Sequence, residues 1–224
     1  MDVDLNGPSL INYSKAKLQG GVFVFQGAIS NKLLFGDEVK ISNSESVDEE
    51  GGIAIFYGTK NYLVMEPKSE ISTCTASKNG GCFKLLGTDI NDVQIVGNLD
   101  YTPKISGTKA DSINAAHASY PKNGGFLYLA GRSQNVLIKN VLVLGQSLAG
   151  GNGGFIYTES ALSQGSSDKI FIQIDSDLAG QTFPNLQAGL RGSFLYVSSM
   201  NAPIIEIIFK NSIFRCTGQD FCTD

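Results

Sequence analysis

Short apolar runs alternate with glycine-rich and polar corners along the whole chain. Six of these runs follow a glycine pair or its remnant, and they are mostly β-branched or aromatic and too short for a helix. A glycine pair supplies the positive backbone dihedral angle and the close approach that a tight corner needs. Each copy therefore predicts a turn followed by a strand. The copies begin at Gly20-Gly21, Gly51-Gly52, Gly80-Gly81, Gly124-Gly125, Gly153-Gly154 and Gly192-Ser193.

The spacing of the copies defines a repeating unit. Their starts are separated by 31, 29, 44, 29 and 39 residues, so the basic unit has 29 to 31 residues and some units carry insertions, which we place at 97–122 and 175–191. A second apolar run follows within most units, and several units contain a third. Two or three short strands per unit predict the coils of an all-β, right-handed parallel β-helix, a solenoid of about six coils.

The domain organisation follows from this repeat. We expect residues 1–18 to lead into the first coil, the β-helix repeats to fill 19–216 and a cysteine-containing tail to occupy 217–224. A propeller blade needs about 40 to 45 residues and four strands, which the shorter units cannot hold. An immunoglobulin-like sandwich does not predict the same glycine-glycine-aromatic phrase six times. The solenoid is therefore the favoured fold.

Stacked coils would place equivalent side chains above one another at a spacing of about 4.8 Å. The phenylalanines behind the glycine pairs are therefore expected to form columns inside the core, with a sugar-stacking surface as the alternative. Solenoids also need caps at their ends. We recognise no capping helix, so we expect a fragment of a longer solenoid or a subunit that stacks end to end. The phenylalanines are Phe23, Phe83, Phe126, Phe155 and Phe194.

Composition and charge narrow the function classes. The 224 residues carry a formal net charge of -4, and the lysines and arginines are scattered along the chain. Nothing gathers positive charge into a stripe that would neutralise a phosphate backbone, so we expect no nucleic-acid partner. No window reaches the roughly 18 to 20 consecutive apolar residues of a membrane-spanning helix. We expect no membrane span in this chain.

Four cysteines fall into two local pairs, Cys74 with Cys82 and Cys216 with Cys222. Local disulfides are the simplest interpretation, while free buried thiols and a metal site remain open. A zinc site usually has CxxC pairs or nearby histidines, and the single histidine, His117, is far from both pairs in the sequence. Because disulfides persist mainly in secreted and cell-surface proteins, the pairs favour an extracellular location.

The first residues complicate this localisation. They have neither a basic start nor an apolar segment, so they do not form a secretory signal peptide. Either the chain is a mature or excised piece, or the cysteines are unpaired. Asn12 opens an Asn-Tyr-Ser triplet and is a candidate glycosylation site.

Two phrases carry a resemblance to a known group of proteins. They are residues 123–128, Asn-Gly-Gly-Phe-Leu-Tyr, and residues 152–157, Asn-Gly-Gly-Phe-Ile-Tyr. With 209–214, Phe-Lys-Asn-Ser-Ile-Phe, they resemble the GGA[ILV] and FxxN repeats of polymorphic outer membrane proteins and related surface proteins of the pectin-lyase-like superfamily. The resemblance covers about residues 19–216. It implies a cell-surface adhesive or scaffold role and carries over no catalytic residue.

Many β-helices of that superfamily cleave polysaccharides, so a lyase or hydrolase is the alternative function. Such chemistry needs carboxylates that face one groove. Alternation along a strand would place Asp175 and Asp177 on one face, but the recognition phrases of these hydrolases are absent. We therefore interpret the two aspartates as solvent-facing residues at a strand end. We therefore expect no enzyme, no cofactor and no metal, and self-association, other surface proteins or glycans as partners. The remaining groups weighed for catalysis are Glu159, Asp168, Arg132 and Arg191.

Overall fold

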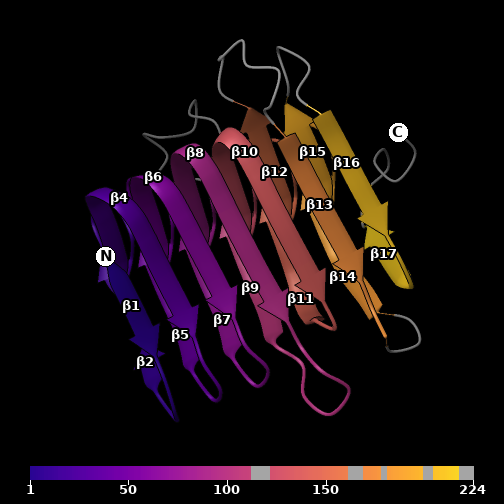
Figure 1. Cartoon of the computed structure of the whole chain (residues 1–224), viewed down its shortest axis with the longest axis horizontal. Coiled ribbons are helices and arrows are strands. Elements are labelled where there is room, and N and C mark those ends of the chain that lie inside the picture. The colour runs from indigo at the N-terminus through magenta and orange to yellow at the C-terminus, as the bar shows by residue number, and fades with distance from the viewer. Residues whose placement is uncertain (112–121, 161–168, 178–180, 199–203, 217–224) are drawn as a thin grey trace.

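The computed structural model of the protein describes residues 1–111, 122–160, 169–177, 181–198 and 204–216. Within these ranges all regular secondary structure is β-strand, and every strand pair is parallel. The strands form two sheets, and the chain passes alternately between them (Figure 1). The prediction of an all-β parallel solenoid is confirmed.

The first sheet contains the run behind each glycine corner and the second apolar run of each unit. Its strands are β1 (Asp2–Leu5), β4 (Phe23–Phe35), β6 (Ala54–Met65), β8 (Phe83–Val96), β10 (Leu127–Lys139), β12 (Ile156–Ser160), β13 (Lys169–Asp175), β15 (Leu195–Ser198) and β16 (Ile204–Phe209). The second sheet contains β2 (Leu10–Asn12), β3 (Lys15–Ala16), β5 (Lys40–Ser46), β7 (Glu70–Ala76), β9 (Lys104–Ala110), β11 (Leu142–Ala149), β14 (Gln181–Ala188) and β17 (Ser212–Cys216).

The units differ from the expected two or three short strands in one respect. In β4, β6, β8 and β10 the first and second apolar runs form one long strand, and the register between neighbouring strands shifts near its middle, as between Gly58 and Lys60. Such an irregularity bends a strand without ending it. The two ranges that we interpreted as insertions also contain regular structure, because β9 lies within 97–122 and β14 within 175–191.

The hydrophobic core lies between the two sheets and contains the predicted phenylalanine columns. Phe126, Phe155 and Phe194 occupy the same place behind their glycine corners, and their ring centroids follow one another at 4.9 and 5.6 Å. Phe83 lies one residue further along and still contacts Phe126 with a centroid distance of 5.6 Å. Phe23 is separated from Phe83 by Ala54 in the register, so it does not continue the column. Phe126 and Phe155 are fully buried, which supports the interpretation of these rings as core.

Candidate functional site

The glycine corners bring successive coils into close contact. The first residue of every corner has a positive φ, between +57° and +71°. The second residue is constrained differently, because a Cβ atom built on Gly52, for example, would lie 2.2 Å from the carbonyl oxygen of Gly81 in the next coil. The same holds at Gly21, Gly81, Gly125 and Gly154, with distances of 2.0 to 2.1 Å. The first glycine thus serves the turn and the second serves the stacking of coils.

The last corner has a serine where the others have their second glycine. Gly192 keeps the positive φ of the turn, at +64°, whereas Ser193 carries a side chain. In the described part of the chain no further glycine corner follows Ser193, so no carbonyl oxygen takes the place of its Cβ atom. The degenerate copy in the sequence therefore has a steric explanation: only the glycine that faces no following corner is replaced.

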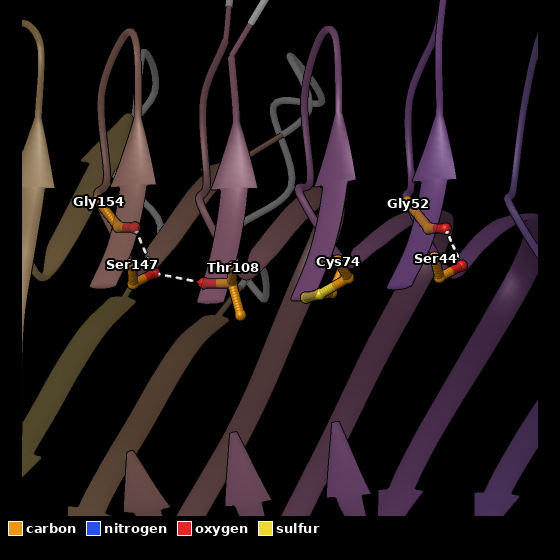
Figure 2. Close-up of a disulfide and its surroundings, with 7 residues drawn as sticks. Ser44, Gly52, Cys74, Thr108, Ser147 and Gly154 are labelled. Carbon is orange, nitrogen blue, oxygen red and sulfur yellow. Dashed lines mark hydrogen bonds between the residues drawn. A yellow bond between two sulfur atoms is a disulfide. The ribbon is translucent and has the colours of Figure 1, made fainter. Parts of the chain in front are cut away.

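A column of small polar residues fastens the second sheet to these corners (Figure 2). Ser44, Cys74, Thr108 and Ser147 are in register on β5, β7, β9 and β11. The Ser44 hydroxyl donates to the carbonyl oxygen of the following corner, Gly52, at 2.5 Å, and Ser147 donates in the same way to Gly154 at 2.8 Å. The Thr108 hydroxyl hydrogen-bonds to that of Ser147 at 2.6 Å. Each hydroxyl thus links its strand either to a glycine corner or to the neighbouring hydroxyl of the column.

The disulfide between Cys74 and Cys82 belongs to the same column. Cys82 directly follows the Gly80-Gly81 corner, and both cysteines are fully buried. The disulfide therefore makes covalently the link that a serine hydroxyl makes in other coils. This confirms one of the two predicted pairs. Of the second pair, the backbone of Cys216 ends β17, while Cys222 lies outside the described residues.

A second, buried column consists of side-chain amides. Asn31, Asn61, Asn91 and Gln134 lie at the bends of β4, β6, β8 and β10. Their side-chain nitrogen and oxygen atoms follow one another at 3.0, 3.0 and 2.9 Å, and the Asn91 amide also donates to the carbonyl oxygen of Ala130 at 2.9 Å. Buried amides that hydrogen-bond to one another fix the register between successive coils. The interval of 30 residues between the asparagines is the sequence signal for this column, and our sequence analysis missed it.

Tyrosines form a third column. The Tyr128 and Tyr157 rings stack with a centroid distance of 4.9 Å, and Tyr196 continues the stack at 5.6 Å. Both Tyr128 and Tyr157 donate hydrogen bonds to the carboxylate of Glu159, at 2.5 and 3.1 Å. Lys84, which is ion-paired with Glu50, lies 5.0 Å from the centre of the Tyr128 ring.

Burial and the nearby charge of Glu159 change the acidity of these phenols. Burial is the larger cause and the Glu159 carboxylate adds to it, which raises the pKa of Tyr157 to about 12 from its ordinary value of 10.0. The pKa of Tyr128 is raised further, by burial and by its hydrogen bond to Glu159. Both groups therefore remain protonated donors at neutral pH. Glu159, one of the carboxylates weighed for catalysis, is held by two phenols.

The other carboxylates do not assemble into a groove. Asp175 is the last residue of β13 and accepts a hydrogen bond from the backbone N–H of Ser176 at 2.8 Å. Asp177 lies beyond the strand, where its carboxylate contacts the Lys139 ammonium at 2.8 Å and the Asn140 amide at 3.2 Å. The hydrogen bond from Lys139, followed by that from Asn140, lowers the pKa of Asp177. β13 ends between the two aspartates, as expected for residues at a strand end, so they do not form a carboxylate pair on one strand face.

The remaining sequence candidates have separate positions. Asn12 is exposed on β2, and its side-chain oxygen accepts hydrogen bonds from Ser42 at 2.7 Å and from Asn43 at 2.9 Å. Ser14, the hydroxyl residue of the same triplet, donates to the carbonyl oxygen of Gly21. Arg132 lies in β10, and Arg191 precedes the last glycine corner. His117 and Asp168 fall outside the described residues.

Among the residues that the structure describes, no three or more histidine, cysteine or acidic side chains come together in a way that could hold a metal ion. A search of the same residues finds no helix with the length and apolar character needed to cross a membrane.

The hydroxyl column predicts how the disulfide can be replaced. In the Cys74→Ser/Cys82→Ala variant, the new hydroxyl can donate to the carbonyl oxygen of Gly81, as Ser44 does to Gly52. In Cys74→Ala/Cys82→Ala the donor is absent. Both variants lose the cross-link, but we expect the serine variant to be more stable by about 1 kcal/mol, the usual net value of a hydrogen bond. Urea unfolding of both variants measures the difference, and equal midpoints would contradict the equivalence of the disulfide and the hydroxyl.

The tyrosine column predicts a pH dependence of stability. Because the folded-state pKa of Tyr157 is about 12 and lies above the unfolded value of about 10, the protonated phenol stabilises the fold below pH 10. This contribution is lost as the pH rises from about 10 to 12, since the unfolded state releases the proton first. Over this window we expect the free energy of unfolding to fall less steeply in Tyr157→Phe than in the wild type. The exposed Tyr13→Phe serves as control, and identical slopes in all three proteins would refute the assignment.

The comparisons with known proteins assign this chain to no family. No protein-family model matches the sequence, and the searches of curated proteins and of solved structures give no match either. The role of the columns described above is therefore inferred from the geometry of this chain alone.

Proposed function

We propose that this protein is an extracellular structural or adhesive β-solenoid that associates through one edge of its first sheet. The observation that carries the proposal is the exposure of inward-facing apolar side chains on β16. Ile207 and Phe209 continue the inward-facing columns of Ile172 and Ile174 on β13, which are fully buried. On β16 the residues of these two columns, Ile207 and Phe209, are 38% and 47% exposed.

Apolar side chains that are exposed at the edge of a sheet in this way favour association with another polypeptide. Among the described strands, β16 pairs only with β13, and it carries exposed apolar side chains. Unpaired edges with these properties readily accept a further strand, and burial of apolar surface contributes about 25 cal/mol per Å². A second copy of the chain or another surface protein are the partners that we propose.

The interior of the solenoid supports a mechanical rather than a catalytic role. Glycine corners, hydroxyls, amides and tyrosines repeat from coil to coil, and each column serves the stacking of the chain on itself. The carboxylates weighed for catalysis also have structural partners, Glu159 in the tyrosine column and Asp177 beside Lys139. We therefore propose that the protein is not an enzyme.

Location and kinship are part of the same proposal. The Cys74–Cys82 disulfide supports an oxidising compartment, and the exposed position of Asn12 leaves its side chain accessible to glycosylation. The glycine-corner repeats of a parallel solenoid support a relationship with the surface proteins of the pectin-lyase-like superfamily. The proposed setting is a cell surface or an extracellular coat.

Sedimentation velocity and electron microscopy of the purified protein test the proposal. We expect the wild type to assemble, with a repeat that is a multiple of the strand spacing of about 4.8 Å when filaments form. The Ile207→Asp/Phe209→Asp variant should weaken this association at least tenfold, because it places charge on the open columns of β16.

Ile29→Asp is the matched control, since Ile29 is exposed on β4 and not on the β16 edge. Circular dichroism of each variant establishes that the sheets are intact. A wild type that remains monomeric at high concentration, or equal association of the wild type and the β16 variant, would overturn the proposal.

A further inference from the structure

The strand β16 has an apolar side and a side that carries charge. Ile207 and Phe209 face inward and continue two columns of the core. Because side chains alternate along a strand, Glu206 and Ile208 face outward. The Glu206 carboxylate is ion-paired with the Lys169 ammonium at 2.9 Å. A strand that pairs with β16 must therefore be apolar on its inward side and compatible with charge on its outward side.

The direction of the backbone groups on β16 follows from one hydrogen bond. Successive residues of a strand direct their N–H and C=O groups to opposite edges. The backbone N–H of Lys210, directly after β16, donates to the carbonyl oxygen of Ile174 on β13 at 2.9 Å. The even-numbered residues thus direct their backbone groups toward β13, while Ile207 and Phe209 direct theirs to the other edge. A further strand on that edge would bond to these two residues.

The charges of this segment are arranged symmetrically about Ile208. Glu206 precedes Ile208 by two residues, and Lys210 follows it by two. Lys210 is exposed, and its ammonium forms no ion pair with any residue that the structure describes. Glu206 contacts Lys169 through Oε2, and a carboxylate can accept through both of its oxygens. An anion and a cation are therefore available at equal distances from Ile208.

Antiparallel pairing with the same strand of a second copy makes these features complementary. With Ile208 opposite Ile208 of the second copy, each residue before this point faces the residue equally far behind it. Glu206 then faces Lys210 at both ends of the pairing, and Ile207 faces Phe209 on the inward side. Opposite charges and apolar side chains that face one another across strands are both stabilising. Ile207 and Phe209 also supply the backbone groups for the inter-strand hydrogen bonds.

Neighbouring registers lack this match. A pairing centred on Glu206 sets the two Glu206 carboxylates opposite one another, which is destabilising. A pairing centred on Ile207 sets Glu206 opposite Ile208, so neither charge gains a partner. Registers that set an inward residue opposite an outward one turn apolar side chains to solvent. The sequence of β16 therefore selects the pairing centred on Ile208.

The opposite end of the first sheet is a poorer partner for β16. β1 lies at that end, far from β16 (Figure 1). If a second copy continued the stack in the register of the other coils, its Asp2 would lie opposite Glu206. Like charges in this position are destabilising. β1 also carries Asp4, and charged side chains protect an edge strand from pairing. Head-to-tail stacking is therefore disfavoured.

We propose that two copies of this chain associate about a two-fold axis through Ile208, with their β16 strands antiparallel and their first sheets joined into one. The inference rests on the association through β16 proposed above, and it names the partner and the symmetry of that contact. A two-fold contact uses the same surface of both copies and closes with two of them. The β1 edge takes no part in it.

Cysteine substitutions test the symmetry. Ile208→Cys sets two thiols opposite one another in a non-hydrogen-bonded pair, where the Cα atoms lie about 4.5 Å apart, within the range of a disulfide. Mild oxidation should therefore convert more than about half of this variant into a covalent dimer on a non-reducing gel. Glu206→Cys is the matched control. Its two thiols would be four residues apart along the strands, about 13 Å, so it should form no more covalent dimer than the wild type.

Charge reversals test the register. Glu206→Lys and Lys210→Glu each set like charges opposite one another at both ends of the pairing, so each should weaken self-association in sedimentation velocity at least fivefold. The double variant restores opposite charges with exchanged signs and should recover most of the loss. Its missing pair with Lys169 is exposed and contributes little. Head-to-tail stacking predicts the reverse for Glu206→Lys, because the new lysine would face Asp2 and strengthen association.

The outcomes distinguish this inference from the association through β16 itself. A cross-link in Ile208→Cys but not in Glu206→Cys, with recovery in the double reversal, supports the two-fold pairing. Self-association without that cross-link, or association strengthened by Glu206→Lys, overturns the two-fold pairing. Association through β16 still stands in that case if Ile207→Asp/Phe209→Asp weakens it. A protein that remains monomeric overturns both.

Discussion

The approach of one glycine corner to the next is the contact on which the rest of this structure depends. At the second corner position, the carbonyl oxygen of the following coil occupies the space in which a side chain would begin. Only a residue without a Cβ atom allows the two coils to come within hydrogen-bonding distance there, and the backbone N–H of Gly52 indeed donates to the carbonyl oxygen of Gly81 at 3.1 Å. Parallel pairing of the strands on either side of the corner follows from this spacing.

Because the corners fix the spacing of the coils, equivalent residues of successive coils contact side chains of the same type. A hydroxyl meets a corner carbonyl, an amide meets an amide and a tyrosine ring meets a tyrosine ring. The columns tolerate substitution only by groups that fulfil the same task, as the Cys74–Cys82 disulfide does in the hydroxyl column. The outer surfaces are not bound by this rule, so the exposed strand β16 can serve contacts with other molecules.

Much of the fold could be predicted from the sequence, because the glycine pairs are both the cause of the stacking and its most visible signal. Phe126 and Phe155 could be assigned to the core from their place behind the corners, and Cys74 could be paired with Cys82 from their proximity in the sequence. The continuity of the long strands β4, β6, β8 and β10 could not be predicted. A polar stretch at the bend of one strand has the same sequence pattern as a loop between two strands.

The candidate sites were less accessible to sequence reasoning. Asn31 and Asn61 are polar residues in a chain rich in polar corners, and only their interval of 30 residues distinguishes them from surface residues. Asp175 and Asp177 could be assigned to a strand end, but alternation alone did not locate the last residue of β13.

The most direct test of the central claim is the stability of two alanine variants at the same corner position, Gly125→Ala and Ser193→Ala, measured by chemical denaturation. Gly125 has no positive φ, so alanine is compatible with its backbone conformation. The obstacles are backbone carbonyl oxygens: that of Gly154, 2.1 Å from the new Cβ atom, and that of Leu148, at 2.7 Å. The account predicts a loss of at least about 3 kcal/mol or failure to fold for Gly125→Ala and little change for Ser193→Ala. Similar stability of the two variants would contradict the claim that the close approach of the glycine corners sets the stacking of the solenoid.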